Sequence, residues 1–197
     1  MRRSIAFFDF DGTITTRDTL LEFIKFSRGT FLFYLGFLLN AHYLLAYKIK
    51  IVSNQTAKEK VLRYFFGKMP FNKFEKFCDD FAKHKIPSLI RPKALKEIKK
   101  LNELQTEVVI VSASPENWIY QWANQVNAKL IATKLEVKRD RITGKIEGRN
   151  CHGREKVNRI AELYTFSDDD IIYAYGDSAA DRYMMDLAKI SFFKPFL

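Results

Sequence analysis

The sequence predicts an α/β fold: a doubly wound parallel sheet with a small helical cap domain and a β-hairpin. Short apolar runs alternate with amphipathic helical stretches along most of the 197 residues. That alternation is typical of parallel strands joined by right-handed helical crossovers. Residues 15–88 interrupt it, because they show helical patterns and no convincing strand.

An apolar run at residues 5–8 opens the chain, and we interpret it as a buried strand. The segment Asp9-Phe-Asp-Gly-Thr13 follows directly and places two carboxylates where that strand ends. Open α/β sheets bind ligands at the carboxyl ends of their strands. Because burying an unpaired carboxylate is costly, Asp9 and Asp11 indicate a bound cation, a shared proton or catalysis. An ordinary Asp-Gly turn is the alternative for this pair taken alone.

The helical insertion is predicted from local patterns. Apolar side chains recur at helical spacing between residues 17 and 26. Thr56-Ala-Lys-Glu59 and Asn72-Lys-Phe-Glu75 match the capping box of a helix start. A connection of this length commonly serves as a lid or a binding element. We therefore expect a cap domain at 15–88 and a core formed by 1–14 and 89–197.

The alternation resumes after the insertion. Pro92 is placed to open a helix, and Ser114-Pro115-Glu116 predicts a second helix start with Ser114 as its N-cap. Residues 135–146 predict a β-hairpin. The other predicted elements are strands at 108–111, 130–132, 171–175 and 190–193 and a helix at 153–163. This order predicts a Rossmann-like core.

Composition limits the partners of the chain. It has 33 Lys and Arg against 23 Asp and Glu, a formal net charge of +10, which favours phosphorylated molecules or acidic membranes. The basic residues follow no nucleic-acid-binding motif, so no nucleic acid partner is expected. Cys78 and Cys151 lie far apart in sequence and predict free thiols in a reducing compartment, hence a cytoplasmic protein.

Further polar side chains follow the later strands. Ser112 comes after the second predicted strand, and Asp177 and Asp181 follow the last strand but one. Lys156 lies in the first turn of a predicted helix. Because the carboxyl ends of parallel strands share one edge, we expect these residues to converge with the two aspartates after the first strand.

Such a cluster suits phosphate chemistry. Carboxylates about 4 Å apart repel by roughly 4 kcal/mol per pair at an effective dielectric near 20, and Mg²⁺, which prefers oxygen ligands, relieves this. The Ser112 hydroxyl and the Lys156 ammonium can bind a phosphate. The amides of Ala113 and Ser114, at the predicted helix start, add donors. An aspartate in line with the phosphorus can act as nucleophile, and a second acid can transfer protons.

These residues resemble, in order, the four motifs of the haloacid-dehalogenase-like hydrolases. The motifs are Asp9-Phe-Asp-Gly-Thr13, Ser112, Lys156 and Gly176-Asp-Ser-Ala-Ala-Asp181. The insertion after the first motif and the segment Asn150-Cys-His-Gly-Arg-Glu-Lys156 are most similar to the phosphoserine-phosphatase-like branch. The resemblance implies Asp9 as nucleophile, Asp11 as general acid and base, and Ser112 and Lys156 as phosphate ligands.

The resemblance also implies a metal site. Mg²⁺ would be held by the Asp9 carboxylate, the Asp11 main-chain carbonyl and Asp177, with Asp181 assisting. The cap would close over a small phosphorylated substrate and exclude water.

Two positions depart from phosphoserine phosphatases. Ala180 stands where they usually carry Asn, and Asp18 stands where they carry a cap glutamate. Asp18 can still bind a substrate amine, or it can serve as a helix N-cap. We therefore expect the phosphatase reaction and leave the serine specificity open.

Residues 31–45, FLFYLGFLLNAHYLL, form a strongly apolar stretch within the cap. Fifteen residues are short for a membrane span, and we expect a buried or interfacial helix. Cap core or apolar substrate wall, membrane-surface contact and a span remain three alternatives. Basic residues on both sides would favour an anionic membrane and a membrane-associated protein.

The preferred hypothesis is a Mg²⁺-dependent phosphatase of a small phosphate monoester, similar to phosphoserine phosphatase. One alternative substrate is a lipid phosphate, a phosphatidylglycerophosphate-like headgroup at the membrane surface. Another hypothesis is a non-catalytic aspartate phospho-acceptor module similar to response-regulator receivers. In those, the acceptor follows a mid-chain strand, where this chain has Ser112. A peripheral membrane protein with a vestigial pocket is the third.

Overall fold

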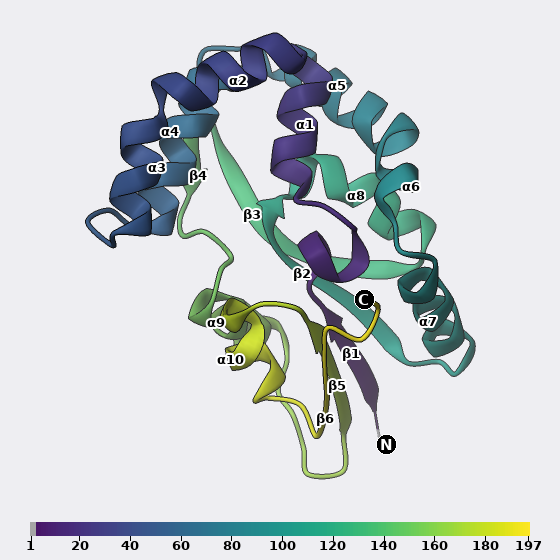
Figure 1. The fold of residues 1–197 in the computed structure, drawn as a ribbon. Helices are drawn as coiled ribbons and strands as arrows, with labels where there is room; N and C mark the ends of the chain where they lie inside the picture. Colours follow the sequence, from purple (N-terminus) through teal and green to yellow (C-terminus); the bar gives the residue numbers. More distant parts are fainter. Residues whose placement is uncertain (1–2) are drawn as a thin grey trace.

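The computed structural model describes residues 3–197, and its centre is a six-stranded sheet (Figure 1). The strands are β1 (Ser4–Phe8), β2 (Glu107–Pro115), β3 (Ala128–Lys138), β4 (Arg141–Glu147), β5 (Ile171–Gly176) and β6 (Ile190–Phe193). Their order is β4-β3-β2-β1-β5-β6, and every pair is parallel except β3 with β4. The predicted parallel sheet and the hairpin are thus confirmed.

Helices cover both faces of the sheet. They are α7 (Pro92–Glu103), α8 (Glu116–Gln125), α9 (Arg154–Leu163) and α10 (Arg182–Met185). Ala6 and Phe8 of β1 belong to an apolar cluster that includes α7 and α8. Ile5 and Phe7 belong to a second cluster, with α9 and α10. Successive side chains of a strand point to opposite faces, so an uninterrupted apolar run fits a strand covered on both sides.

The helical insertion lies between the turn after β1 and α7, over the carboxyl ends of the strands (Figure 1). Its helices are α1 (Thr19–Arg28), α2 (Thr30–Leu39), α3 (Ala41–Lys48), α4 (Asn54–Phe66), α5 (Phe71–His84) and α6 (Ile86–Leu89). A bridge between Thr15 and Ile90 closes its base. Phe23 of α1 stacks on Trp118 of α8 with ring centroids 4.5 Å apart, so the core runs from the sheet into the insertion.

The apolar stretch at 31–45 forms two helices instead of the single helix expected. α2 and α3 meet at Asn40 with a bend of 60°, and the Asn40 side-chain amide donates to the Gly36 carbonyl at 2.8 Å. Gly36 lets α2 approach α4, because a Cβ there would lie 2.2 Å from the Phe65 ring. Within residues 3–197 no single helix is long and apolar enough to span a membrane, although the bent pair meets that test by length and composition.

The predicted helix start at Ser114 is wrong. β2 continues through Pro115, and α8 begins at Glu116. The Ser114 hydroxyl donates to Asp11 Oδ2 at 2.6 Å, and its N–H donates to the Ser112 hydroxyl at 3.0 Å. Tertiary hydrogen bonds therefore take the polar atoms that a local N-cap would have used.

Other local predictions were also shifted. Ser53, not Thr56, caps α4 by accepting the Thr56 N–H at 3.0 Å, and Glu59 accepts the Ile146 N–H of β4 instead of completing a capping box. Asn72 lies inside α5, which begins one residue earlier. The strand predicted at 130–132 and the first strand of the hairpin are one continuous strand, β3.

Candidate active site

The site begins at the turn that follows β1. The Asp9 N–H donates to the Tyr175 carbonyl of β5 at 2.9 Å, which aligns the two strand ends. Gly12 has a φ of +86°, and a Cβ at this position would lie 2.4 Å from Asp177 Oδ2. Thr13 Oγ1 donates to Asp177 Oδ1 at 3.3 Å. Only glycine combines that backbone conformation with such a close approach, so Gly12 lets the turns after β1 and β5 meet.

Lys156 lies buried between two carboxylates. Its Nζ is 2.6 Å from Asp9 Oδ1 and 2.7 Å from Asp181 Oδ1, and 1% of the residue is exposed. Asp181 Oδ2 also accepts the N–H and the hydroxyl of Ser178, at 3.0 and 2.7 Å. Charges buried this deeply are tolerated only when they are paired and hydrogen-bonded, and this cluster meets both conditions.

The protonation of the cluster follows from burial and pairing. Burial raises the pKa of Asp9 to about 7, although Lys156 acts in the opposite direction. Burial also acts to raise the pKa of Asp181, but Lys156 and Ser178 outweigh it and hold that pKa below its usual value. Burial acts to lower the pKa of Lys156, but the two carboxylates raise it overall. Lys156 therefore stays charged, and Asp9 is the carboxylate that a further cation would keep ionised.

Three carboxylates offer ligands to one point. Oxygens of Asp9, Asp177 and Asp181 all lie within 4.8 Å of one another. An oxygen-only donor set fits a hard divalent cation such as Mg²⁺. Asp177 is half-buried, and burial together with the Asp181 charge raises its pKa, which a cation would also relieve. These residues would hold the predicted metal.

The side chain of Asp11 points elsewhere. Its Oδ1 accepts the Thr19 N–H of α1 at 2.6 Å, and its Oδ2 accepts the Ser114 hydroxyl at 2.6 Å. Thr19 is tied in turn to α8, because its hydroxyl accepts from the Trp118 ring nitrogen at 3.1 Å. The Asp11 side chain thus joins the sheet edge to the first helix of the insertion. This does not conflict with the predicted metal site, in which only the main-chain carbonyl of Asp11 is a ligand.

The predicted phosphate ligands on β2 lie at two depths. Ser112 is completely buried, with its hydroxyl 3.5 Å from Asp11 Oδ2. Ala113 and Ser114 line the cavity. The β2–β3 ladder shifts register between Ser112 and Pro115, and α8 begins only after this bulge. Ala113 and Ser114 therefore lie in β2 and not at a helix start, so that part of the prediction is wrong; phosphate binding by Ser112 and Ala113 stays a prediction.

The position of Asp18 is compatible with both roles that its sequence context left open, a helix N-cap and a contact with the substrate. Its Oδ1 accepts the Leu21 N–H at 3.1 Å, so it is the N-cap of α1. It also lines the cavity, where burial and the Asp11 charge raise its pKa to about 6. Contact with a substrate remains a prediction.

Lys58 of α4 is a further cavity residue, and no sequence pattern singles it out. Its Nζ donates to the Ala113 carbonyl at 2.5 Å and to Asn150 Oδ1 at 3.3 Å. Burial lowers the pKa of Lys58 to about 8. No short motif marks this lysine. It lies within Thr56-Ala-Lys-Glu59, a pattern that predicts a capping box, and only the packing of α4 brings it over β2.

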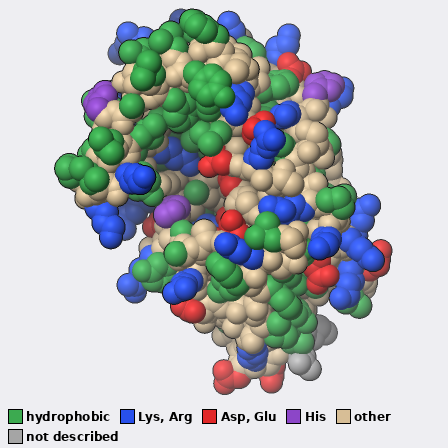
Figure 2. Space-filling model, in the orientation of Figure 1, with side chains coloured by type: hydrophobic (Ala, Val, Ile, Leu, Met, Phe, Trp, Pro, Cys, Tyr) green, Lys and Arg blue, Asp and Glu red, His purple; other side chains and the backbone are tan. Residues whose placement is uncertain are grey.

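A cavity of about 370 Å³ connects these groups. Figure 2 shows the hollow between the insertion and the sheet, with acidic side chains inside it. The floor is formed by the charged residues of the core. The opposite wall belongs to α1–α4 and is mostly apolar: Leu20, Leu21, Phe37, Leu44, Tyr47, Ala57 and Val61. The cavity is therefore polar on the side of the sheet and mostly apolar on the side of the insertion.

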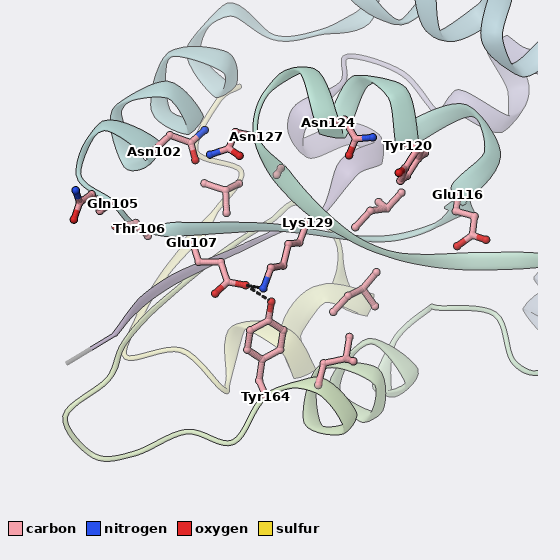
Figure 3. A pocket seen from close by; sticks show the side chains of 15 residues that line it. Asn102, Gln105, Thr106, Glu107, Glu116, Tyr120, Asn124, Asn127, Lys129 and Tyr164 are labelled. Atoms are coloured by element: carbon pink, nitrogen blue, oxygen red, sulfur yellow. Dashed lines mark hydrogen bonds and ion pairs between the residues drawn. The ribbon is translucent and has the colours of Figure 1, made fainter. Parts of the chain in front are cut away.

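A larger groove of about 820 Å³ lies along β2, β3 and α8 (Figure 3). Two of its charged side chains are paired with each other, because Glu107 Oε1 lies 2.6 Å from Lys129 Nζ, and Glu107 also accepts the Tyr164 hydroxyl at 2.5 Å. Glu107 is at the amino end of β2, whereas ligands of α/β sheets bind at the carboxyl ends. The smaller cavity is the candidate active site.

Comparison with known proteins agrees with this geometry. A family model described as haloacid dehalogenase-like hydrolase matches residues 6–186. The chain belongs to this family. Among relatives of this haloacid dehalogenase-like hydrolase, Protein CicA of Caulobacter vibrioides (strain NA1000 / CB15N) is 33% identical over 183 residues, covering 92% of this chain and 81% of that protein.

Solved structures share the fold of this haloacid dehalogenase-like hydrolase. A protein of unknown function from Bordetella pertussis Tohama I superposes with a TM-score of 0.78 and 19% identity, covering 98% of this chain and 90% of that one. A phospho-aspartyl intermediate analogue of phosphoserine phosphatase superposes with a TM-score of 0.66 and 18% identity, covering 98% and 87%. At these identities the likeness establishes the fold, which is that of phosphoserine phosphatase.

Proposed function

We propose that this hydrolase is a Mg²⁺-dependent phosphatase that cleaves a phosphate monoester through an aspartyl-phosphate on Asp9. The observation that carries the proposal is the convergence of Asp9, Lys156, Asp177 and Asp181 at the carboxyl edge of the sheet, facing the cavity beneath the insertion. A single aspartate pair would be an ordinary turn, but residues from both ends of the chain meet at one point here.

The residues divide the reaction between them. An Asp9 carboxylate oxygen attacks the phosphorus, the bond from phosphorus to the ester oxygen breaks, and the proton of Asp11 moves to the leaving oxygen. Asp11 then takes a proton from water as the water oxygen attacks the phosphorus, which frees inorganic phosphate and restores the Asp9 carboxylate. To reach the ester oxygen, Asp11 must exchange one of its present hydrogen bonds, to Thr19 or Ser114.

Charge compensation favours this assignment. A Mg²⁺ ion held by Asp9, Asp177 and Asp181 would offset the negative charge of the phosphate. Lys156 fixes the orientation of Asp9 and supplies the permanent positive charge next to it. Without such cations, a carboxylate floor would repel a phosphate dianion.

The insertion would select the substrate. Asp18, the N-cap of α1, and Lys58 of α4 both line the cavity and can contact an amine and an anionic group, respectively. The cytoplasmic location stays a prediction; Cys78 and Cys151 are both free and buried.

Hydrolysis of an aryl phosphate by the purified chain tests the reaction. We expect turnover that requires Mg²⁺, stops on chelation and falls by at least about a thousandfold in Asp9→Asn. Asp169→Asn, an exposed aspartate outside the cavity, is the matched control and should keep full activity. Turnover by Asp9→Asn at the wild-type rate would remove Asp9 as the nucleophile.

A further inference from the structure

α2, α3 and the turn after them expose an unusually apolar surface. We call this surface the α2–α3 face: Phe31, Leu32, Tyr34, Leu38, Leu39, Leu45, Ile49 and Ile51. Leu38 is 72% exposed, and Phe31 and Ile51 are exposed even more. Hydrophobic side chains gather over this part of the molecule in Figure 2. A contiguous apolar surface of this kind marks a site of interaction with another apolar phase.

The same two helices are apolar on their inner side. Phe37 of α2 and Leu44 of α3 line the cavity and pack against the core. A helix that is apolar all round is typical of a core or of a lipid environment, and the outer side here has no protein to cover it within residues 3–197. The apolar wall of the cavity and the α2–α3 face are thus two sides of one thin layer.

The charged side chains in and around α2 and α3 are all basic. Residues 23–58 contain no Asp or Glu, while Lys25, Arg28, Lys48, Lys50 and Lys58 are basic. Lys48 and Lys50 are exposed beside the α2–α3 face. A second copy of the chain would bring like charges together, whereas an anionic lipid surface complements them.

We propose that the α2–α3 face inserts into the surface of an anionic lipid membrane and that the cavity accepts a phosphate monoester bearing an acyl or alkyl chain. The substrate part rests on the proposed function. The phosphate would meet Asp9 on the polar floor, and the chain would lie along the wall formed by Phe37, Leu44 and Val61. The helices have 10 and 8 residues and are bent by 60°, which suits a pair lying within the interface.

Co-sedimentation of the full chain with vesicles tests the membrane part. Phosphatidylcholine vesicles with phosphatidylglycerol should bind the protein, and binding should weaken without the anionic lipid. The double variant Leu38→Glu with Leu45→Glu should lower binding at least tenfold. Leu104→Glu should not, because Leu104 is also exposed, at 65%, but lies after α7 and outside the α2–α3 face.

The double variant Lys48→Gln with Lys50→Gln should lower binding to anionic vesicles roughly fivefold per lysine. Lys96→Gln with Lys99→Gln, exposed on α7, should leave it unchanged.

Turnover of matched esters tests the substrate part. We expect kcat/KM for 1-acyl-glycerol 3-phosphate in vesicles to exceed that for glycerol 3-phosphate at least tenfold. Leu38→Glu with Leu45→Glu should abolish this preference and leave hydrolysis of a water-soluble aryl phosphate unchanged. Equal kcat/KM values for the two esters would overturn the substrate part.

The remaining outcomes separate this proposal from the proposed function. Failure to bind anionic vesicles, with normal aryl phosphate hydrolysis, would overturn the membrane part alone. A dimer in solution that Leu38→Glu converts to a monomer, without vesicle binding, would assign the face to a second copy. Vesicle binding without hydrolysis of any ester would support the membrane part and overturn the proposed function.

Discussion

Polar side chains at the sheet edge are paired with opposite charges or hydrogen-bonded, whereas the helical insertion contributes a mostly apolar wall with few polar contacts. At the sheet edge, Lys156 is paired with Asp9 and Asp181, and Asp11 makes two hydrogen bonds of 2.6 Å. In the insertion, Lys58 makes contact only with neutral oxygens at hydrogen-bond distance, and most of the cavity wall is apolar. The core thus holds its charged side chains in fixed pairs, whereas the insertion presents a mostly apolar wall to the same cavity.

Removing the core lysine should have the largest effect. Lys156→Met leaves Asp9 and Asp181 buried without their counter-charge, and breaking a buried pair in this way costs about 3–5 kcal/mol. We expect that loss in the free energy of unfolding, measured by urea denaturation, together with loss of activity. Lys58→Met should change the free energy of unfolding by less than about 1 kcal/mol. Equal losses of unfolding free energy in the two variants would show that Lys156 in the core is no more important for stability than Lys58 in the insertion.

Gly12→Ala should disturb the core next. The added Cβ must avoid Asp177 and adopt a positive φ, and strain of this kind costs about 1–3 kcal/mol. We also expect weaker Mg²⁺ binding in calorimetry, because Asp177 would move. Gly29→Ala is the control, since Gly29 has a φ of +82° and no atom within 4 Å of the added Cβ. Mg²⁺ binding weakened equally in both variants would show that the contact with Asp177 does not matter.

Lys58 should give the insertion a pH dependence. With its pKa lowered to about 8, the ammonium is charged below that pH and neutral above it. KM for an anionic substrate should therefore rise as the pH increases through about 8. Lys58→Arg, whose guanidinium stays charged, should remove this rise, and Lys58→Met should raise KM roughly tenfold at pH 7. A KM of the wild type that is flat between pH 7 and 9 would contradict a contact between Lys58 and the substrate.

A peripheral ion pair should have the smallest effect. Arg3 holds the pKa of Asp170 far below its usual range, with the two side chains 2.6 Å apart. A depressed carboxyl pKa adds stability above the unfolded value of about 3.9, and this stability is lost as the pH falls through the folded value. The wild type should thus lose Tm on acidification more steeply than Asp170→Asn. Parallel Tm profiles below pH 5 would contradict this.

The sequence predicted the core of the molecule well for a physical reason. Parallel strands end at one edge, so Asp9, Ser112 and Asp177 were expected on the same edge, and the pairing of β1 with both β2 and β5 makes them neighbours. Short-range signals were less reliable where tertiary contacts compete. Ser114 bonds Asp11 instead of capping a helix, and Glu59 bonds the hairpin instead of its own helix start.

The insertion was harder to predict because the positions of its helices depend on tertiary packing, which local sequence patterns do not show. Nothing local to Lys58 indicates that α4 carries it over β2, and periodicity alone did not show that Asn40 would divide the apolar stretch into two helices. Apolar composition likewise left open whether residues 31–45 were core or surface. The structure shows both, with one side lining the cavity and the other exposed.

The most direct test is mass spectrometry of the protein acid-quenched during turnover of a phosphate ester with Mg²⁺. We expect one added phosphoryl group on the peptide that contains Asp9, absent in Asp9→Asn and lost on treatment with hydroxylamine. A phosphoryl group on another residue, or steady release of phosphate with none on the protein, would contradict it.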